Sequence, residues 1–354
     1  MIDFRYHLVS IVAVFLALAI GIVLGAAELQ GPTYNILNHT TAKLQNEYDQ
    51  TRGQLTTAQA QANEGESYAQ AVEPAVLRDL LTGQRLLIVT EPGAQSSVVS
   101  GITAAAADAG ASVTGQIALQ PEFFGTSSIT QDSLNQTTLD VAHSADISLA
   151  NSGSYQQQAV QVIASEILAK SQKSAAGQSG GSQSASSQSA SADQSSDAQA
   201  MLAAYASSGF LNTTGQPATQ ASLVVVVTPQ NVPSDGTADP LAQVLPPLVA
   251  ELAATSSATV VAGSSAGSGS GSPMAVLRSN NVANQVSTVD DADLASGQSV
   301  VIQALAILLA GGKAGSYGLA GNGANAVAPT PAPTPSASAS PTPTPTSSSK
   351  KAKK

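Results

Sequence analysis

An uninterrupted apolar stretch runs from Leu8 to Ala27, and Ser10 is its only polar side chain. At a helical rise of ~1.5 Å per residue, the stretch is about 30 Å long, which matches the hydrocarbon thickness of a bilayer. Lipid also imposes a helix, because every backbone N–H and C=O group needs a partner within the segment. The sequence therefore predicts a transmembrane helix over 8–27, with the lipid bilayer as its partner.

The charges on either side of this stretch predict its orientation. Arg5 precedes it, whereas Glu28 and a long neutral region follow it. The positive-inside rule places residues 1–7 in the cytoplasm and everything after the helix outside it, in the cell membrane or envelope. A cleaved signal peptide is the alternative, since Gly25-Ala26-Ala27 offers small residues for cleavage. The apolar run exceeds the usual ~7–15 residues of a signal core, which favours a retained single-pass anchor.

The composition excludes several classes of function. The net charge is −10 and charged residues make up 10% of the chain, so nucleic acid is not an expected partner. Four of the 13 basic residues lie in the final segment Lys350–Lys354, where they could touch anionic cell-wall polymers. The absence of Cys excludes disulfides and thiolate metal sites.

A coiled-coil stalk is predicted over 32–72. It follows the helix-start signal Gly31-Pro32, and Glu73-Pro74 is expected to end or bend it. The stalk predicts a homo-oligomer above the membrane; the alternative is a single solvated helix docked on the following domain. Apolar or small residues recur at alternating steps of three and four, which is a heptad pattern: Tyr34, Leu37, Thr41, Leu44, Tyr48, Thr51, Leu55, Ala58 and Ala62.

Two related α/β halves are predicted over 83–170 and 200–318. Continuous β-branched runs such as RLLIVT and LVVVVT are typical of strands buried on both faces, and intervening helices imply parallel crossovers. We therefore expect one Rossmann-like, mainly parallel α/β domain built from both halves. The expected strands are 85–90, 112–119, 223–228, 258–262, Met274–Leu277 and Val286–Val289, and the expected helices are 95–109, 239–255 and 294–309.

Two segments are predicted to be disordered. Residues 171–199 are nearly all Ser, Gln, Ala and Gly, which cannot bury enough apolar surface to offset the entropy of ordering. Residues 319–354 are rich in Pro, Thr and Ser and end in lysines, which is typical of an extended tail.

The sequence offers little catalytic or cofactor chemistry. No phosphate-binding glycine motif follows the strands, no G-x-S-x-G motif is present, and the exported part holds only His39 and His143 as imidazole bases. We therefore predict that the protein is not an enzyme and has no cofactor. The one dense group of metal-ligand residues is Asp290, Asp291 and Asp293. These residues fit a helix N-cap better than a hard-cation site, which stays the alternative.

The opening residues MIDFRYHLVS, which run into VAVFLALAIGIVLG, resemble the start of the actinobacterial copper transport protein B family. The same family order continues in RLLIVTEPG, Val289-Asp290-Asp291, and Gly315-Ser316-Tyr317-Gly318. The resemblance implies a role in keeping intracellular copper low, with copper as a transported ion and an outer-membrane location. The residues themselves do not favour a pore made by a single chain, because the expected strands are short and uniformly apolar.

The sequence thus predicts a membrane-anchored envelope protein that contributes to copper homeostasis, through efflux or transport, without catalysis. The alternative is a structural or interaction scaffold of the envelope with no direct copper role. Soft ligands do not distinguish the two, since Met1, Met201 and Met274 are scattered along the chain.

Overall fold

The computed structural model describes residues 4–149, 153–168, 186–230 and 240–319. The chain divides into two compact units, Met1–Ser67 and Tyr68–Lys354. Most of the C-terminal segment predicted to be disordered lies outside the described residues.

Helix α1 (Phe4–Leu77) begins in the first unit and ends in the second. It contains both the predicted transmembrane segment and the predicted stalk segment. Gly31-Pro32 does not start a new helix, because helical backbone continues through both residues. Pro74 likewise does not end the helix, which continues to Leu77.

The second unit is built on one mixed seven-stranded sheet with the order β3-β2-β1-β4-β5-β6-β7. Only β3 is antiparallel to its neighbour. The strands are β1 (Arg85–Thr90), β2 (Ser112–Leu119), β3 (Leu211–Gly215), β4 (Leu223–Val227), β5 (Ala258–Ala262), β6 (Ser287–Val289) and β7 (Ser316–Tyr317).

The two sequence halves join at the centre of this sheet, as predicted. β1 pairs in parallel with β4, in a register that sets Leu86 beside Leu223. Both strands are buried on both faces, which explains their uninterrupted apolar sequences. Alternate residues contribute to opposite cores: Leu87 packs into one core and Ile88 into the other.

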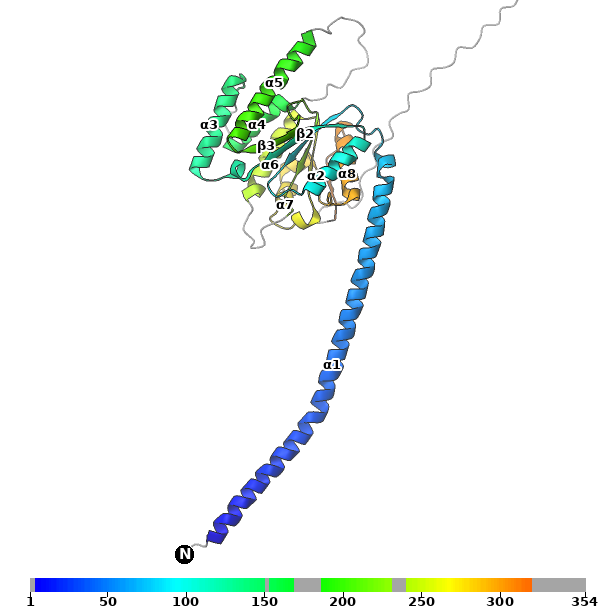
Figure 1. Ribbon diagram of the computed structural model, residues 1–354, viewed down its shortest axis with the longest axis vertical. Coiled ribbons are helices and arrows are strands. Elements are labelled where there is room, and N and C mark those ends of the chain that lie inside the picture. The colour runs from blue at the N-terminus through cyan, green and yellow to red at the C-terminus, as the bar shows by residue number, and fades with distance from the viewer. Residues whose placement is uncertain (1–3, 150–152, 169–185, 231–239, 320–354) are drawn as a thin grey trace, which may run out of the picture. The chain divides into compact units, whose positions relative to one another are not determined.

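Helices cover both faces of the sheet (Figure 1). One face carries α2 (Ser96–Asp108) and α8 (Ala295–Leu309). These two helices pack on each other and on the core that contains Ile88. The opposite face carries α3 (Ser128–Ser144), α4 (Tyr155–Ile167), α5 (Ser186–Ser207), α6 (Pro240–Thr255) and α7 (Pro273–Arg278). Short 3-10 turns are η1 (Pro121–Phe124), η2 (Ser265–Gly267) and η3 (Asn281–Asn284).

Two sequence-based expectations are wrong. The predicted strand Met274–Leu277 is part of helix α7, because the Ser272 hydroxyl accepts a hydrogen bond from the Ala275 N–H and Pro273 occupies the first helical turn. The predicted disordered insertion 171–199 is also wrong in its second part, since α5 begins at Ser186, whereas residues 171–185 lie outside the described residues. Ala198 on that helix is fully buried and so adds to the core.

Candidate functional site

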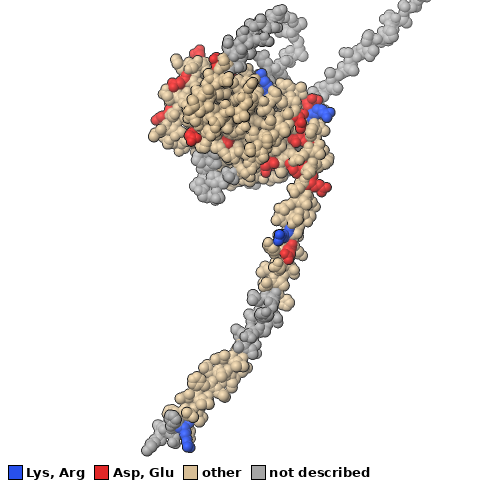
Figure 2. All heavy atoms as spheres, in the orientation of Figure 1, with Lys and Arg blue, Asp and Glu red and all other residues tan. Residues whose placement is uncertain are grey.

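The N-terminal part of α1 is the first candidate functional element. The segment Arg5–Gly25 is long and apolar enough to cross a membrane, and none of it is buried within the chain. Figure 2 shows this segment beyond its basic start without charged side chains. Side chains such as Phe15 and Leu16 are 67% and 61% exposed, which is unfavourable in water and is relieved by lipid. The segment therefore fits a membrane anchor.

The second candidate region is the edge of the sheet where the parallel strands end. From β1 the sheet continues to β2 on one side, and from β4 it continues to β5, β6 and β7 on the other side. The β1–β4 pair is therefore the point at which the strand order reverses. In open α/β sheets, ligands bind outside the carboxyl ends of the strands at such a point. A ligand site would therefore be expected at the carboxyl ends of β1 and β4.

The loops after β1 and β4 contact each other at the β1–β4 position. The Glu91 side chain, directly after β1, is only 2% exposed, and its backbone N–H donates to the Val227 carbonyl at 3.0 Å. The loop after β4 packs against the loop after β1, since the Gln230 N–H donates to the Gly93 carbonyl at 3.4 Å. The Gln95 amide also donates to the Gln230 side chain.

A hollow of about 450 Å³ lies beside this position, between the end of β1, the first turns of α2 and β2. Gln116 donates its side-chain N–H to the Thr90 hydroxyl at 3.2 Å in this hollow. The described residues that line it are neutral, so they supply no acid, base or charged ligand: Thr90, Ala94, Ser96, Val99, Ser100, Thr103 and Gln116. The hollow suits a small neutral molecule better than an ion.

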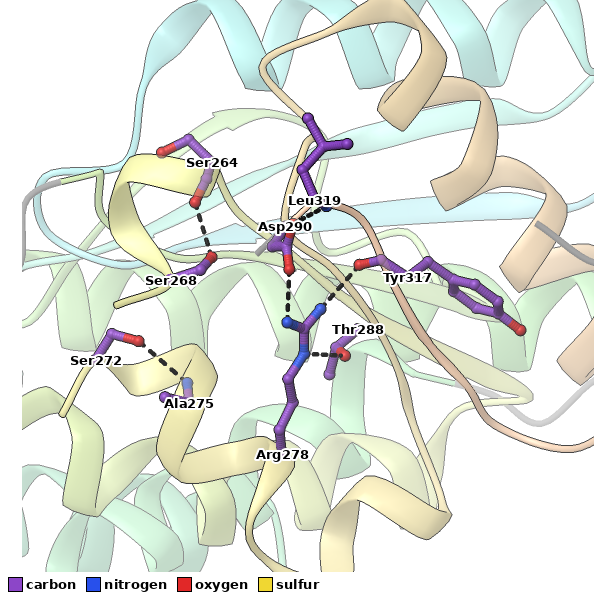
Figure 3. Close-up of polar contacts among 9 residues, drawn as sticks. All are labelled: Ser264, Ser268, Ser272, Ala275, Arg278, Thr288, Asp290, Tyr317 and Leu319. Atoms are coloured by element: carbon purple, nitrogen blue, oxygen red, sulfur yellow. Dashed lines mark hydrogen bonds and ion pairs between the residues drawn. The ribbon is translucent and has the colours of Figure 1, made fainter. Parts of the chain in front are cut away.

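A buried ion pair lies at the carboxyl end of β6 (Figure 3). Arg278, the last residue of α7, binds the Asp290 carboxylate at 2.6 Å, and the two side chains are 10% and 0% exposed. The guanidinium also donates to the Thr288 hydroxyl at 2.9 Å and to the Tyr317 carbonyl at 2.8 Å. The second Asp290 oxygen accepts the Leu319 N–H at 2.7 Å. These contacts join α7, β6 and the strand β7 into one polar network.

Gly318 is required by this network. Its φ is +121°, a left-handed value that side chains rarely adopt, and a Cβ there would overlap the Asp290 carboxylate oxygen. The late Gly315-Ser316-Tyr317-Gly318 sequence thus has a structural explanation. Gly318 lets the backbone after β7 come close to the buried Asp290 carboxylate, so that the Leu319 N–H can donate a hydrogen bond to it.

The aspartate cluster does not form the predicted helix cap. The N-cap residue of α8 is Leu294, which makes no side-chain cap hydrogen bond. Asp290 instead pairs with Arg278, and Asp293 is exposed. Asp291 is 9% exposed, and its Oδ1 has no hydrogen-bond partner among the described residues. Burial raises the pKa of the Asp291 carboxyl, and the neighbouring Asp290 carboxylate raises this pKa further.

The candidate metal ligands do not gather. Within the described residues, no group of three His, Asp or Glu side chains could hold a metal ion. His39 and His143 are exposed on α1 and α3, whereas Met201 and Met274 are buried in α5 and α7. The hollow of about 350 Å³ between α3 and α5 is lined by Met201 with two carboxylates, Asp140 and Asp197, but by no imidazole among the described residues.

Comparison with known proteins identifies the family. The family described as "Copper transport outer membrane protein, MctB" matches residues 1–329. The chain belongs to this family. A Mycobacterium tuberculosis protein named copper transporter MctB is 28% identical over 333 residues, which cover 92% of this chain and 99% of the relative. A Mycobacterium leprae protein of the same name is 25% identical over 340 residues, with the same coverage of both chains.

The MctB family match confirms the resemblance seen in the opening residues and in the late glycine motif. It covers both the membrane-length helix and the α/β domain, so the two belong together in the family. Sequence reasoning missed Arg278, the partner of Asp290. The sequence signal for this ion pair is weak. Arg278 is one of only 13 basic residues, and it directly follows the short apolar segment Met274–Leu277.

Proposed function

We propose that this chain is an envelope protein, anchored by α1, that helps to keep intracellular copper low without catalysing a reaction. The observation that carries the proposal is the family match over residues 1–329, together with relatives named copper transporters. The membrane-length segment Arg5–Gly25 supports an anchored location. Residues 1–7 would lie in the cytoplasm and the α/β domain outside it, because Arg5 precedes the apolar segment.

Copper enters this proposal as cargo, without a resident site on the α/β domain. Copper selection uses clustered thioether, thiolate or imidazole ligands. In the part of the chain that the structure describes, the imidazoles lie on α1 and α3 and the thioethers on α5 and α7, and they form no cluster that could hold a metal ion. We therefore expect the purified protein to bind copper weakly and to act through other copies or through an envelope partner. The family description names an outer-membrane location, which is the alternative placement of the anchor; in that case residues 1–7 would not lie in the cytoplasm.

The test is cell-associated copper, measured by mass spectrometry in a deletion strain and its parent under mild copper load. A several-fold rise that the intact gene reverses would support the proposal. Cell copper that stays unchanged would contradict it and favour an anchored scaffold. A scaffold that touches anionic wall polymers predicts salt-sensitive wall association, which is lost when Lys350–Lys354, outside the described residues, are removed.

A further inference from the structure

One face of α1 between Thr41 and Ala62 carries large apolar side chains that the described residues leave exposed. Leu44, Tyr48 and Leu55 are 60%, 61% and 57% exposed. Their spacing of four and seven residues places them along one narrow stripe of the helix. A stripe of exposed large apolar side chains on an otherwise polar helix is typical of a surface that another helix covers.

The shape of this stripe matches that of a coiled-coil seam. In the heptad assignment, Thr41, Tyr48 and Leu55 occupy a positions, whereas Leu44 and Thr51 occupy d positions. A shallow hollow on α1 is lined by Thr41, Leu44, Gln45, Glu47, Tyr48 and Thr51. In a parallel coiled coil, residues 41, 44, 45 and 48 form the hole that receives Leu44 of the second helix. Residues 44, 47, 48 and 51 form the hole that receives Tyr48 of the second helix.

We propose that α1 pairs with α1 of a second copy, parallel and in register, along the face from Thr41 to Ala62. The parallel direction follows from the anchor. Every copy carries the same membrane-length segment at the start of α1, so all copies leave the bilayer in the same direction.

The charges along the seam favour this register. Glu47 occupies a g position and Arg52 occupies the e position of the next heptad, five residues later. In a parallel in-register pair, these two positions of opposite chains lie beside each other, so each dimer gains two Glu–Arg pairs. Three other charged residues lie away from the seam: Lys43, Asp49 and Glu64. Lys43 contacts Glu47 of its own chain at 3.7 Å.

The least favourable helix residue of the segment also lies away from the seam. Gly53 occupies an f position, opposite the a and d positions, and among the described residues no atom outside the adjoining helix backbone lies within 4 Å of the place where its Cβ would stand. Gly53 therefore weakens the helix without leaving a hole between the two copies.

The seam alone is weak, since Thr51, Ala58 and Ala62 bury less apolar area than Leu or Ile. Confinement in one membrane compensates, because it raises the effective concentration of a neighbouring α1 without any new contact. The pairing is thus expected to be reversible and to depend on the anchor.

Single cysteines test the direction and register, because the natural chain has no Cys. The full chain is placed in phospholipid vesicles at low protein density and treated with a mild thiol oxidant. Thr41→Cys and Ala62→Cys, which lie about 32 Å apart along the helix, should each form a disulfide-linked dimer. In an antiparallel pair, at most one position along the face can meet its own copy, so efficient linking at both sites supports the parallel register.

The matched controls are Asn46→Cys and Ala60→Cys at outward f positions, which should link at least tenfold more slowly. Equal linking rates at seam and outward positions would overturn the proposal, because random collision in the membrane links both alike. Linking at neither seam position would also overturn it, and would favour a different partner helix on this face.

Charge reversal tests the seam independently of cysteine chemistry. Glu47→Arg places like charges opposite each other and should weaken the dimer about tenfold, measured by energy transfer between labelled copies in vesicles. Glu47→Arg combined with Arg52→Glu should restore the pairing. The control Glu64→Arg makes the same change in net charge on the outer face and should leave the dimer within about twofold. Equal weakening by Glu47→Arg and Glu64→Arg would overturn the register.

Discussion

The buried pair between Arg278 and Asp290 gives a stability prediction whose size follows from the structure. Arg278→Met keeps much of the side-chain volume but removes the charge and three hydrogen bonds, to Asp290, Thr288 and the Tyr317 carbonyl. The Asp290 carboxylate, 0% exposed, then keeps the Leu319 N–H but loses its counter-charge. Removal of one partner of a buried pair costs about 3–5 kcal/mol, a large share of the ~5–15 kcal/mol that stabilises a typical domain.

Urea unfolding of the full chain in detergent, followed by near-ultraviolet circular dichroism, measures this loss. Arg85→Met is the matched control, because Arg85 is exposed at the start of β1 and should cost less than ~0.5 kcal/mol. The double variant Arg278→Met with Asp290→Asn should be more stable than Arg278→Met alone, since it removes the Asp290 charge together with that of Arg278. The reasoning fails if Arg278→Met costs no more than Arg85→Met, or if the double variant is the least stable.

Three further outcomes are expected. Gly318→Ala should destabilise the fold by ~2 kcal/mol or more in the same urea assay, because its Cβ would overlap Asp290, whereas Gly271→Ala, with positive φ but open space, should cost only ~1 kcal/mol. Asp291→Asn should raise stability at neutral pH. Because burial raises the folded-state pKa of this carboxyl, the gain should vanish as pH falls below its ordinary value of 3.8, and a pH-independent change would contradict this cause. Leu16→Arg should release the chain from carbonate-washed membranes, since a central Arg costs ~2.5–3.5 kcal/mol, while Leu16→Ile should stay bound.

The central strands could be predicted because their signal is local. Leu86–Val89 and Leu223–Val227 are buried on both faces, so each forms an uninterrupted run of apolar residues, which is typical of a central strand. The flanking helices α2 and α8 were also predicted, from apolar or Ala-rich segments bounded by glycine or polar residues. The helices α3 and α4 and the strand β3 were not predicted, because polar residues dilute their apolar pattern.

The polar network could not be predicted because its contacts are long-range. Asp290 reads as a helix cap when only the following residues are considered, yet its partner Arg278 precedes it by a turn, a 3-10 segment and a strand. The helix α7 is a different case. Ser272-Pro273 is a helix-start signal that is visible in the sequence. The apolar residues Met274–Leu277 after it favoured the prediction of a strand.

The membrane segment limits how this protein could move copper. One helix cannot enclose a polar path through lipid, because its backbone groups bond within the helix and its apolar side chains face outward. Pairing of two copies through α1 adds a second such helix but no polar surface, since Ser10 is the only polar side chain between Leu8 and Ala27. A dimer of this kind would therefore influence copper through a partner that supplies the path. It follows that cross-linking from the α/β domain should capture that partner in copper-loaded cells, and that variants which break the α1 pair should weaken the capture.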